Sequence, residues 1–182
     1  GIPPALQTIL FSLVYMVIGR IVTSFGDTIY GIQRAAAQIE SLCFSTASGF
    51  MSAMNTYTAQ NYGAGNQERI HKGFKIGVIY MVILGSAAGL LFFFFAEPLM
   101  GIFFRDEYAI AEGANYLHIM IYSQVFICLE AVGSGCYNGI GRTVIPSTAS
   151  IVFNLIRIPL AFALIKVIPG VSGVWWAITI SG

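Results

Sequence analysis

The hydrophobic positions of the chain form long continuous runs, which short segments with glycine, proline or charged residues separate. About 20 apolar residues in a helix cross the hydrocarbon core of a bilayer, where only a helix or a closed barrel satisfies every backbone group. The runs lack the alternation of a strand, so they predict membrane-spanning helices. We expect five full helices at residues 5–24, 30–61, 76–96, 113–137 and 144–168, and a truncated sixth at 173–182.

Two of these runs carry further information. The second is longer than a bilayer requires, so it should project from the membrane or tilt within it. The last is too short to span. Because the chain also begins with glycine and has no signal-peptide pattern, we expect residues 1–182 to be a segment of a longer protein.

Composition narrows the class of protein. Only 9% of the residues are charged while 57% are hydrophobic, and the mean hydropathy is +0.78, which excludes an ordinary soluble domain. A net charge of +1 gives no field that would attract nucleic acid. The three cysteines lie in apolar surroundings without the spacing of metal ligands, so we expect neither a metal site nor a disulfide. No cofactor is expected.

The charged residues between the runs indicate the orientation, since Lys and Arg near short loops stay in the cytoplasm. Arg69, Lys72 and Lys75 follow the second predicted helix, and Arg142 follows the fourth. The opposite ends carry a mixed to acidic set of residues, namely Asp27, residues 105–107, Glu112 and Lys166. The first helix is therefore predicted to run from the cytoplasm outward.

Polar residues form stripes on two of the predicted helices. On the second helix they recur at steps of three and four, which places them on one face: Arg34, Gln38, Ser41, Ser45, Ser48, Ser52 and Asn55. The fifth helix repeats the pattern with Thr143, Ser147, Ser150, Asn154 and Arg157. Such stripes avoid lipid, so each either packs against another helix or lines a polar cavity.

Two carboxylates within the runs are candidates for ion binding. Glu130 is flanked by apolar residues on both sides, so it could exchange a proton or hold a cation. The alternative is a structural ion pair with Arg157. Glu40 is a second and weaker candidate, because it lies one position off the polar stripe and nearer the outer end of its helix.

Several local sequences, in this order, resemble the multidrug and toxic compound extrusion (MATE) transporters. They are GIPPALQ at 1–7, FG at 25–26, TAQNYGAGNQERI at 58–70, AEPLMGIFFRDEY at 96–108 and GCYNGIGRTVIPS at 135–147. The third is the most specific, since it is similar to the Gly-Gln-Asn-x-Gly-Ala loop of that family. The resemblance covers nearly the whole chain.

This resemblance implies an all-α, polytopic transporter of twelve helices in two lobes, of which residues 1–182 would be the second. It also implies a non-enzymatic antiporter of the plasma membrane that exports small organic cations and amphipathic drugs in exchange for H⁺ or Na⁺. Its partners would be the lipid bilayer and the first lobe. In the Na⁺-coupled branch the first and fourth helices of this lobe supply acids. Here Glu130 lies on the fourth, whereas the first has none.

The substrate cavity is predicted from polar and aromatic residues on these helices. Tyrosines can stack on drug cations or offer cation–π contacts. The candidates are Gln7, Tyr15, Gln38, Asn55, Tyr57, Ser123, Gln124, Tyr137, Asn154 and Arg157. Glycines 133, 135, 139 and 141 mark either bending points or close helix packing.

Three rival functions remain open. A lipid-linked saccharide flippase of the same wider superfamily would need several cations for a pyrophosphate, and Arg157 and Arg34 are the available ones. An intramembrane enzyme is disfavoured, because the spans hold no HExxH, no GxSxG and no close pair of acids. A channel or structural subunit would lack coupling to an ion gradient.

Overall fold

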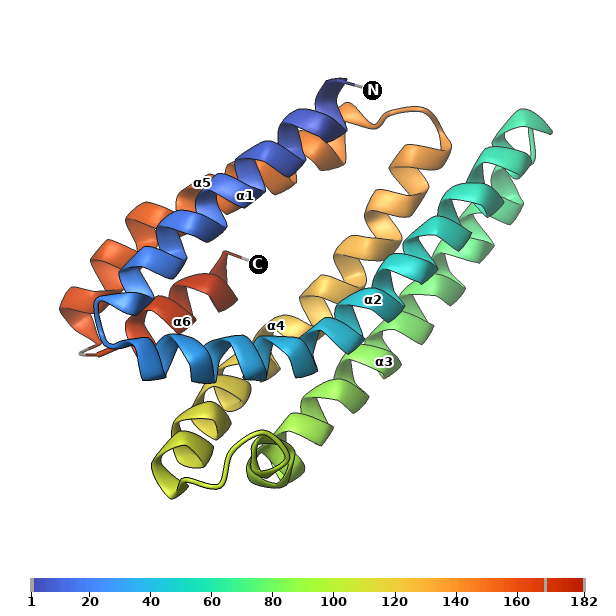
Figure 1. The fold of residues 1–182 in the computed structure, drawn as a ribbon. Coiled ribbons are helices and arrows are strands. Elements are labelled where there is room, and N and C mark those ends of the chain that lie inside the picture. The colour runs from blue at the N-terminus through green and yellow to red at the C-terminus, as the bar shows by residue number, and fades with distance from the viewer. Residues whose placement is uncertain (1, 169, 182) are drawn as a thin grey trace.

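The computed structural model describes the backbone of residues 2–168 and 170–181, and the side chains of 8–168 and 170–181. These residues form a bundle of six α-helices, so the predicted all-α fold class is confirmed (Figure 1). The helices are α1 (Ile2–Thr23), α2 (Asp27–Gly63), α3 (Gln67–Gly101), α4 (Glu107–Gly139), α5 (Val144–Val167) and α6 (Ser172–Ile180).

The helices α3 and α4 begin earlier than the hydrophobic runs predict. Each added turn is polar and is stabilised locally. In α3, Lys72 forms an ion pair with Glu68 at 2.8 Å, one turn apart. Before α4, the side chain of Asp106 accepts a hydrogen bond from the amide of Ala109 at 3.1 Å. Hydropathy detects the part of a helix that lies in lipid, so it misses such turns.

The connection between α2 and α3 is a tight hairpin. Gly65 takes a φ of 71°, in the left-handed region that favours glycine, so the chain reverses within a few residues. Asn66 precedes α3, but its side chain makes no capping hydrogen bond.

The six helices form two arms. In the first arm, α2 and α3 pack along α4; in the second, α1 lies beside α5, and α6 packs against both α5 and α4 (Figure 1). A shared hydrophobic cluster joins the arms and draws buried side chains from all six helices. A second, smaller cluster, called the inner cluster below, contains buried residues of α2, α3 and α4 only: Ala47, Met54, Met81, Cys128, Ala131 and Val132. The arms are therefore packed together at one end of the bundle and not at the other.

Close packing of α4 on α2 depends on glycine. A Cβ atom at Gly135 would lie 2.6 Å from the carbonyl oxygen of Met51, and one at Gly139 would lie 2.7 Å from that of Asn55. The two glycines are four residues apart on one helix face, in the manner of a GxxxG contact. Of the two interpretations of these glycines, close packing therefore describes Gly135 and Gly139.

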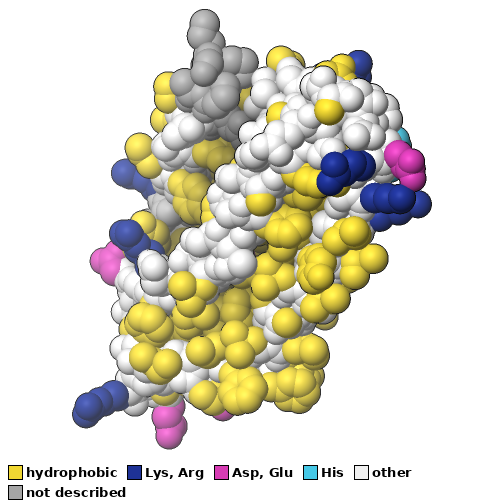
Figure 2. Space-filling view, turned by 90° about the vertical axis from the view of Figure 1, so that its right-hand side faces the viewer, with side chains coloured by type: hydrophobic (Ala, Val, Ile, Leu, Met, Phe, Trp, Pro, Cys, Tyr) yellow, Lys and Arg dark blue, Asp and Glu magenta, His cyan; other side chains and the backbone are white. Residues whose placement is uncertain are grey.

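Three described helices, α3, α4 and α5, are long and apolar enough to cross a bilayer, and Thr8–Thr23 forms a shorter apolar helix. The polar stripe lowers the hydropathy of α2, and the described side chains of α1 begin at Thr8, so the five full spans stay a prediction. On the face shown in Figure 2, hydrophobic side chains cover the middle and lower surface, and basic side chains gather at the upper right.

Candidate functional site

The carboxylate of Glu40 lies at the contact between α2 and α4. The hydroxyl of Tyr116 donates a hydrogen bond to Oε2 at 3.0 Å, and Nε2 of Gln124 donates one to Oε1 at 3.2 Å. Tyr116 and Gln124 are eight residues apart on α4, so they hold the carboxylate from two sides along one helix face. Both are fully or almost fully buried, whereas Glu40 is half-buried.

The position of Glu40 on its helix explains this placement. It is one position off the polar stripe, which turns it from the open face of α2 toward the packed face that carries Ile39 and Ala47. Ile39 belongs to the shared hydrophobic cluster and Ala47 to the inner one. The carboxylate thus lies where the two clusters meet, and nearer the first end of α2 (Asp27) than the last (Gly63).

Arg157 provides a buried positive charge on α5. Its Nε donates a hydrogen bond to the hydroxyl of Ser181 at 2.9 Å, and its side chain is 8% exposed. Its charge interacts electrostatically with Tyr15, Tyr116, Glu40 and Glu130. Within the described residues, however, no salt bridge within 4.0 Å joins Arg157 to a carboxylate. The charge of Glu40 is therefore only partly compensated.

Two buried amide oxygens near this region have no hydrogen-bond donor among the described residues. They are Oε1 of Gln124 and Oδ1 of Asn154, which lies one turn before Arg157 on α5. A buried acceptor without a partner costs free energy, of order 1–3 kcal/mol. Both oxygens are thus suited to a bound donor or cation. No three His, Cys, Asp or Glu side chains in the described part come together as a metal-binding group.

Glu130 occupies a different environment. Its Oε1 accepts a hydrogen bond from the hydroxyl of Ser150 at 2.7 Å, and its side chain is exposed. The described side chains do not form the alternative ion pair between Glu130 and Arg157 within 4.0 Å. Because Glu130 is on α4 and Ser150 on α5, this hydrogen bond joins the two arms.

Sequence reasoning assigned no role to Trp175, which is fully buried on α6. Its indole Nε1 donates to Oε1 of Gln33 at 2.9 Å, and its ring packs edge-on against Tyr116 at 5.3 Å between centroids. Gln33 and Glu40 are one heptad apart on α2. This spacing is visible in the sequence and places the two side chains on one helix face.

The other predicted cavity residues fall into three groups. Ser123 is buried on α4, like Gln124, and donates to a carbonyl of its own helix. Tyr57 donates a hydrogen bond to the carbonyl of Arg69 at 2.9 Å, so its hydroxyl is engaged at the hairpin between α2 and α3. The remaining described candidates are exposed, namely Tyr15, Gln38, Asn55 and Tyr137. The side chain of Gln7 lies outside the described residues.

Comparison with known proteins places the chain in a family. The family model MatE matches residues 3–163, which is most of the chain. The chain belongs to the MatE family. The resemblance that the sequence motifs indicated is thereby confirmed. As a MatE protein it is a multi-pass protein of the plasma membrane.

Its relatives are substantially longer. The MatE chain is 28% identical over 177 residues to the probable multidrug resistance protein NorM of Thermotoga maritima, covering 96% of this chain and 38% of that protein. It is 25% identical to the FAD transporter of Shewanella oneidensis, covering 98% of this chain and 40% of that protein. A MOP superfamily transporter from Pyrococcus furiosus has the same fold, with a TM-score of 0.92, 19% identity, and coverage of 99% of this chain and 40% of that chain. The chain thus spans about two fifths of the proteins it matches.

Proposed function

We propose that the full-length protein is a secondary active antiporter that exports cationic or amphipathic drugs in exchange for H⁺ or Na⁺, and that residues 1–182 form its second lobe. Family membership and the similarity to a probable multidrug resistance protein support this proposal. The exchanged ion is a substrate of the cycle. Two carboxylates of this chain are candidates for binding it, and their surroundings differ.

Glu40 is the carboxylate that we assign to the coupling ion. The observation that carries this assignment is a partly compensated carboxylate between two hydrophobic clusters, held by Tyr116 and Gln124. A carboxylate removed from water is stabilised by a proton or a cation. The unpartnered Oε1 of Gln124 adds a second oxygen that accepts a donor or a cation.

Glu130 then acts at the contact between the arms. A carboxylate that accepts a hydrogen bond from Ser150 links α4 to α5. Loss of its negative charge, by protonation or by cation binding, weakens that charge-assisted hydrogen bond. In this proposal Glu40 holds the ion, and Glu130 adjusts how firmly the arms are joined.

The drug-binding surface is proposed on the open face of α2 and on the exposed tyrosines. Gln38 and Asn55 belong to the polar stripe and are exposed in this chain. An exposed polar stripe on a membrane helix requires a partner other than lipid. The relatives are more than twice as long, so the first lobe is the proposed partner of this face. Tyr15 and Tyr137 offer aromatic surface for organic cations.

The test is efflux of a fluorescent organic cation from everted vesicles that contain the full-length protein, with Na⁺ and pH gradients imposed separately. Wild-type transport should stop when one of the two gradients is collapsed. Glu40→Gln should lower gradient-driven efflux by about tenfold or more, because it removes the charge and its two charge-assisted hydrogen bonds. Glu97→Gln, an exposed acid of α3, should transport like the wild type.

The outcomes separate the residue from the activity. If Glu40→Gln keeps both its efflux and its ion dependence while Glu130→Gln is inactive, the ion site is to be assigned to Glu130 instead. Wild-type efflux that does not depend on either gradient, with the protein verified in the membrane, would refute the antiporter proposal.

A second candidate function is movement of a phosphate-bearing substrate, which includes the lipid-linked saccharide flippase. One relative is an FAD transporter. Arg157 is a buried cation, and in the described region only its Nε has a hydrogen-bond partner, which leaves its other donors for a phosphate. Two points argue against this function. A pyrophosphate is usually bound by several cations, and Arg20 of α1 and Arg34 of α2 are exposed. Binding of a pyrophosphate-containing lipid or nucleotide in place of organic cations would favour this function.

A further inference from the structure

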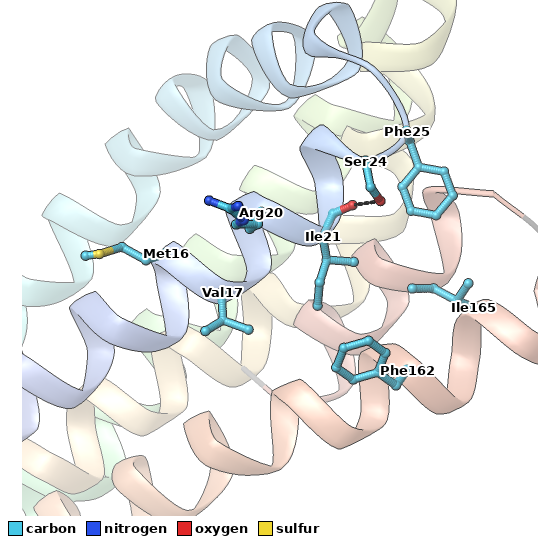
Figure 3. A pocket seen from close by; sticks show the side chains of 8 residues that line it. All are labelled: Met16, Val17, Arg20, Ile21, Ser24, Phe25, Phe162 and Ile165. Carbon is cyan, nitrogen blue, oxygen red and sulfur yellow. Dashed lines mark hydrogen bonds between the residues drawn. The ribbon is translucent and has the colours of Figure 1, made fainter.

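A groove runs between the last turns of α1 and α5, on the surface of the second arm. It has a volume of about 640 Å³. Its walls are apolar: Val17 and Ile21 of α1 face Phe162 and Ile165 of α5 (Figure 3). Met16 lines the end nearer the middle of α1. The groove is separate from Glu40, Gln124 and Arg157, none of which lines it.

The polar groups of the groove lie at the C-terminal ends of the two helices. Arg20 and Ser24 are its polar lining residues. The guanidinium of Arg20 is exposed, and no carboxylate lies within 4.0 Å of it in the described structure. Lys166 follows Ile165 in the last turn of α5 and is also exposed. The helix dipole favours cations at such ends, which explains the charges but not the apolar groove below them.

The direction of the groove matches the direction of a lipid molecule. From Ser24 to Met16 it follows α1 for eight residues, or about 12 Å at the helical rise. Lys72 at the start of α3 and Arg142 between α4 and α5 lie at the opposite helix ends, so the positive-inside rule predicts that Arg20 and Lys166 are at the outer boundary of the membrane. A ligand in this groove therefore meets positive charge at the surface and apolar side chains toward the bilayer centre.

We propose that the groove binds an anionic glycerophospholipid of the outer leaflet. One acyl chain lies between Val17 and Phe162, and the phosphate lies next to Arg20, at the end of the groove where α5 carries Lys166 in its last turn. A phosphodiester with a neutral headgroup keeps its full negative charge toward both cations, whereas a choline headgroup adds a positive charge beside them. Charge complementarity thus favours phosphatidylglycerol over phosphatidylcholine.

The test is a lipid titration of the full-length protein in mild detergent, followed by native mass spectrometry. The probes are phosphatidylglycerol and phosphatidylcholine with identical acyl chains. Wild type should bind the first more tightly. Arg20→Gln should weaken phosphatidylglycerol binding about fivefold, the usual effect of one cation near a membrane surface. Val17→Trp fills the groove and should remove tight binding of either lipid.

Controls and a second measurement keep the test decisive. Arg105→Gln removes an exposed charge from the loop between α3 and α4 and should bind like the wild type. Equal affinity for the two lipids, or wild-type binding in both Arg20→Gln and Val17→Trp, would overturn the proposal. A fluorophore on Val17→Cys should be quenched more by nitroxide-labelled phosphatidylglycerol than by the labelled choline lipid. Protection from both labelled lipids would mean that another part of the protein covers the groove, and would also overturn it.

Discussion

Replacement of Gly135 by alanine tests the contact between α2 and α4. The added methyl group would lie 2.6 Å from the carbonyl oxygen of Met51 and 2.8 Å from Cβ of Met54. Neither atom belongs to the flexible end of a side chain, so α2 has to shift. Gly133 lies two residues earlier on the same helix and has no heavy atom within 4 Å of its added Cβ. It is therefore a matched control.

The expected magnitudes follow from two opposing effects. Exchange of glycine for alanine inside a helix stabilises by about 0.5–1 kcal/mol, and both variants share this gain. Overpacking of a tight contact costs about 1–3 kcal/mol, and only Gly135→Ala incurs it. The two variants should thus differ by about 1–3 kcal/mol in the free energy of unfolding. Gly135→Ala should therefore have the lower midpoint of thermal unfolding.

The assay is thermal unfolding of the purified full-length protein in one detergent, followed by the loss of the monodisperse peak in size-exclusion chromatography. Gly133→Ala should melt at or above the wild-type temperature, and Gly135→Ala below it. Gly139→Ala should also melt lower, since its Cβ would lie 2.7 Å from the carbonyl of Asn55. Equal melting of the variants at 133 and 135 would refute the close approach of the two helices.

Two further predictions address the contact between α2 and α4. Tyr116→Phe removes a hydrogen-bond donor 3.0 Å from the carboxylate of Glu40. The ion concentration for half-maximal efflux should therefore shift by about tenfold. Tyr122 is an exposed tyrosine of the same helix, so Tyr122→Phe should leave this concentration unchanged. An unchanged ion dependence in Tyr116→Phe would contradict the assignment of the ion to this carboxylate. The sulfur atoms of Cys43 and Cys128 are 4.0 Å apart, so a membrane-permeable oxidant should join them in a disulfide that peptide mass mapping detects. Failure to form this link in folded protein would argue against the register of the two helices.

The sequence predicts the presence of each helix because hydrophobic runs and glycine breaks are local properties. The hydrophobic run alone does not predict where α3 begins, because residues 67–75 are mostly polar and carry no hydropathy signal. For the same reason the capping hydrogen bond of Asp106 moves the start of α4 from the expected residue 113 to Glu107. Boundaries outside lipid depend on single polar contacts.

The candidate site is only partly readable from the sequence. Periodicity identifies Glu40, Gln124 and Arg157 as polar residues on membrane helices, but it gives no information on which helix faces they meet. Flanking apolar residues made Glu130 look more enclosed than Glu40, yet Glu130 is exposed and Glu40 is half-buried. Burial depends on the crossing of α2 over α4, which is a property of the tertiary packing. The contribution of Trp175 on α6 is non-local for the same reason.

The packing of the two arms has a mechanical consequence. The shared hydrophobic cluster joins them at one end, while the inner cluster involves only the arm of α2, α3 and α4. At the opposite end the backbone connection of residues 140–143 links α4 to α5, so a rotation at the packed end changes the separation of the arms only within the reach of this connection. Glu40 lies where the packed end of the arms stops, and the hydrogen bond between Ser150 and Glu130 is a second contact between the arms. We therefore expect a change in the packing around Glu40 to alter the separation of the arms at the hydrogen bond between Ser150 and Glu130.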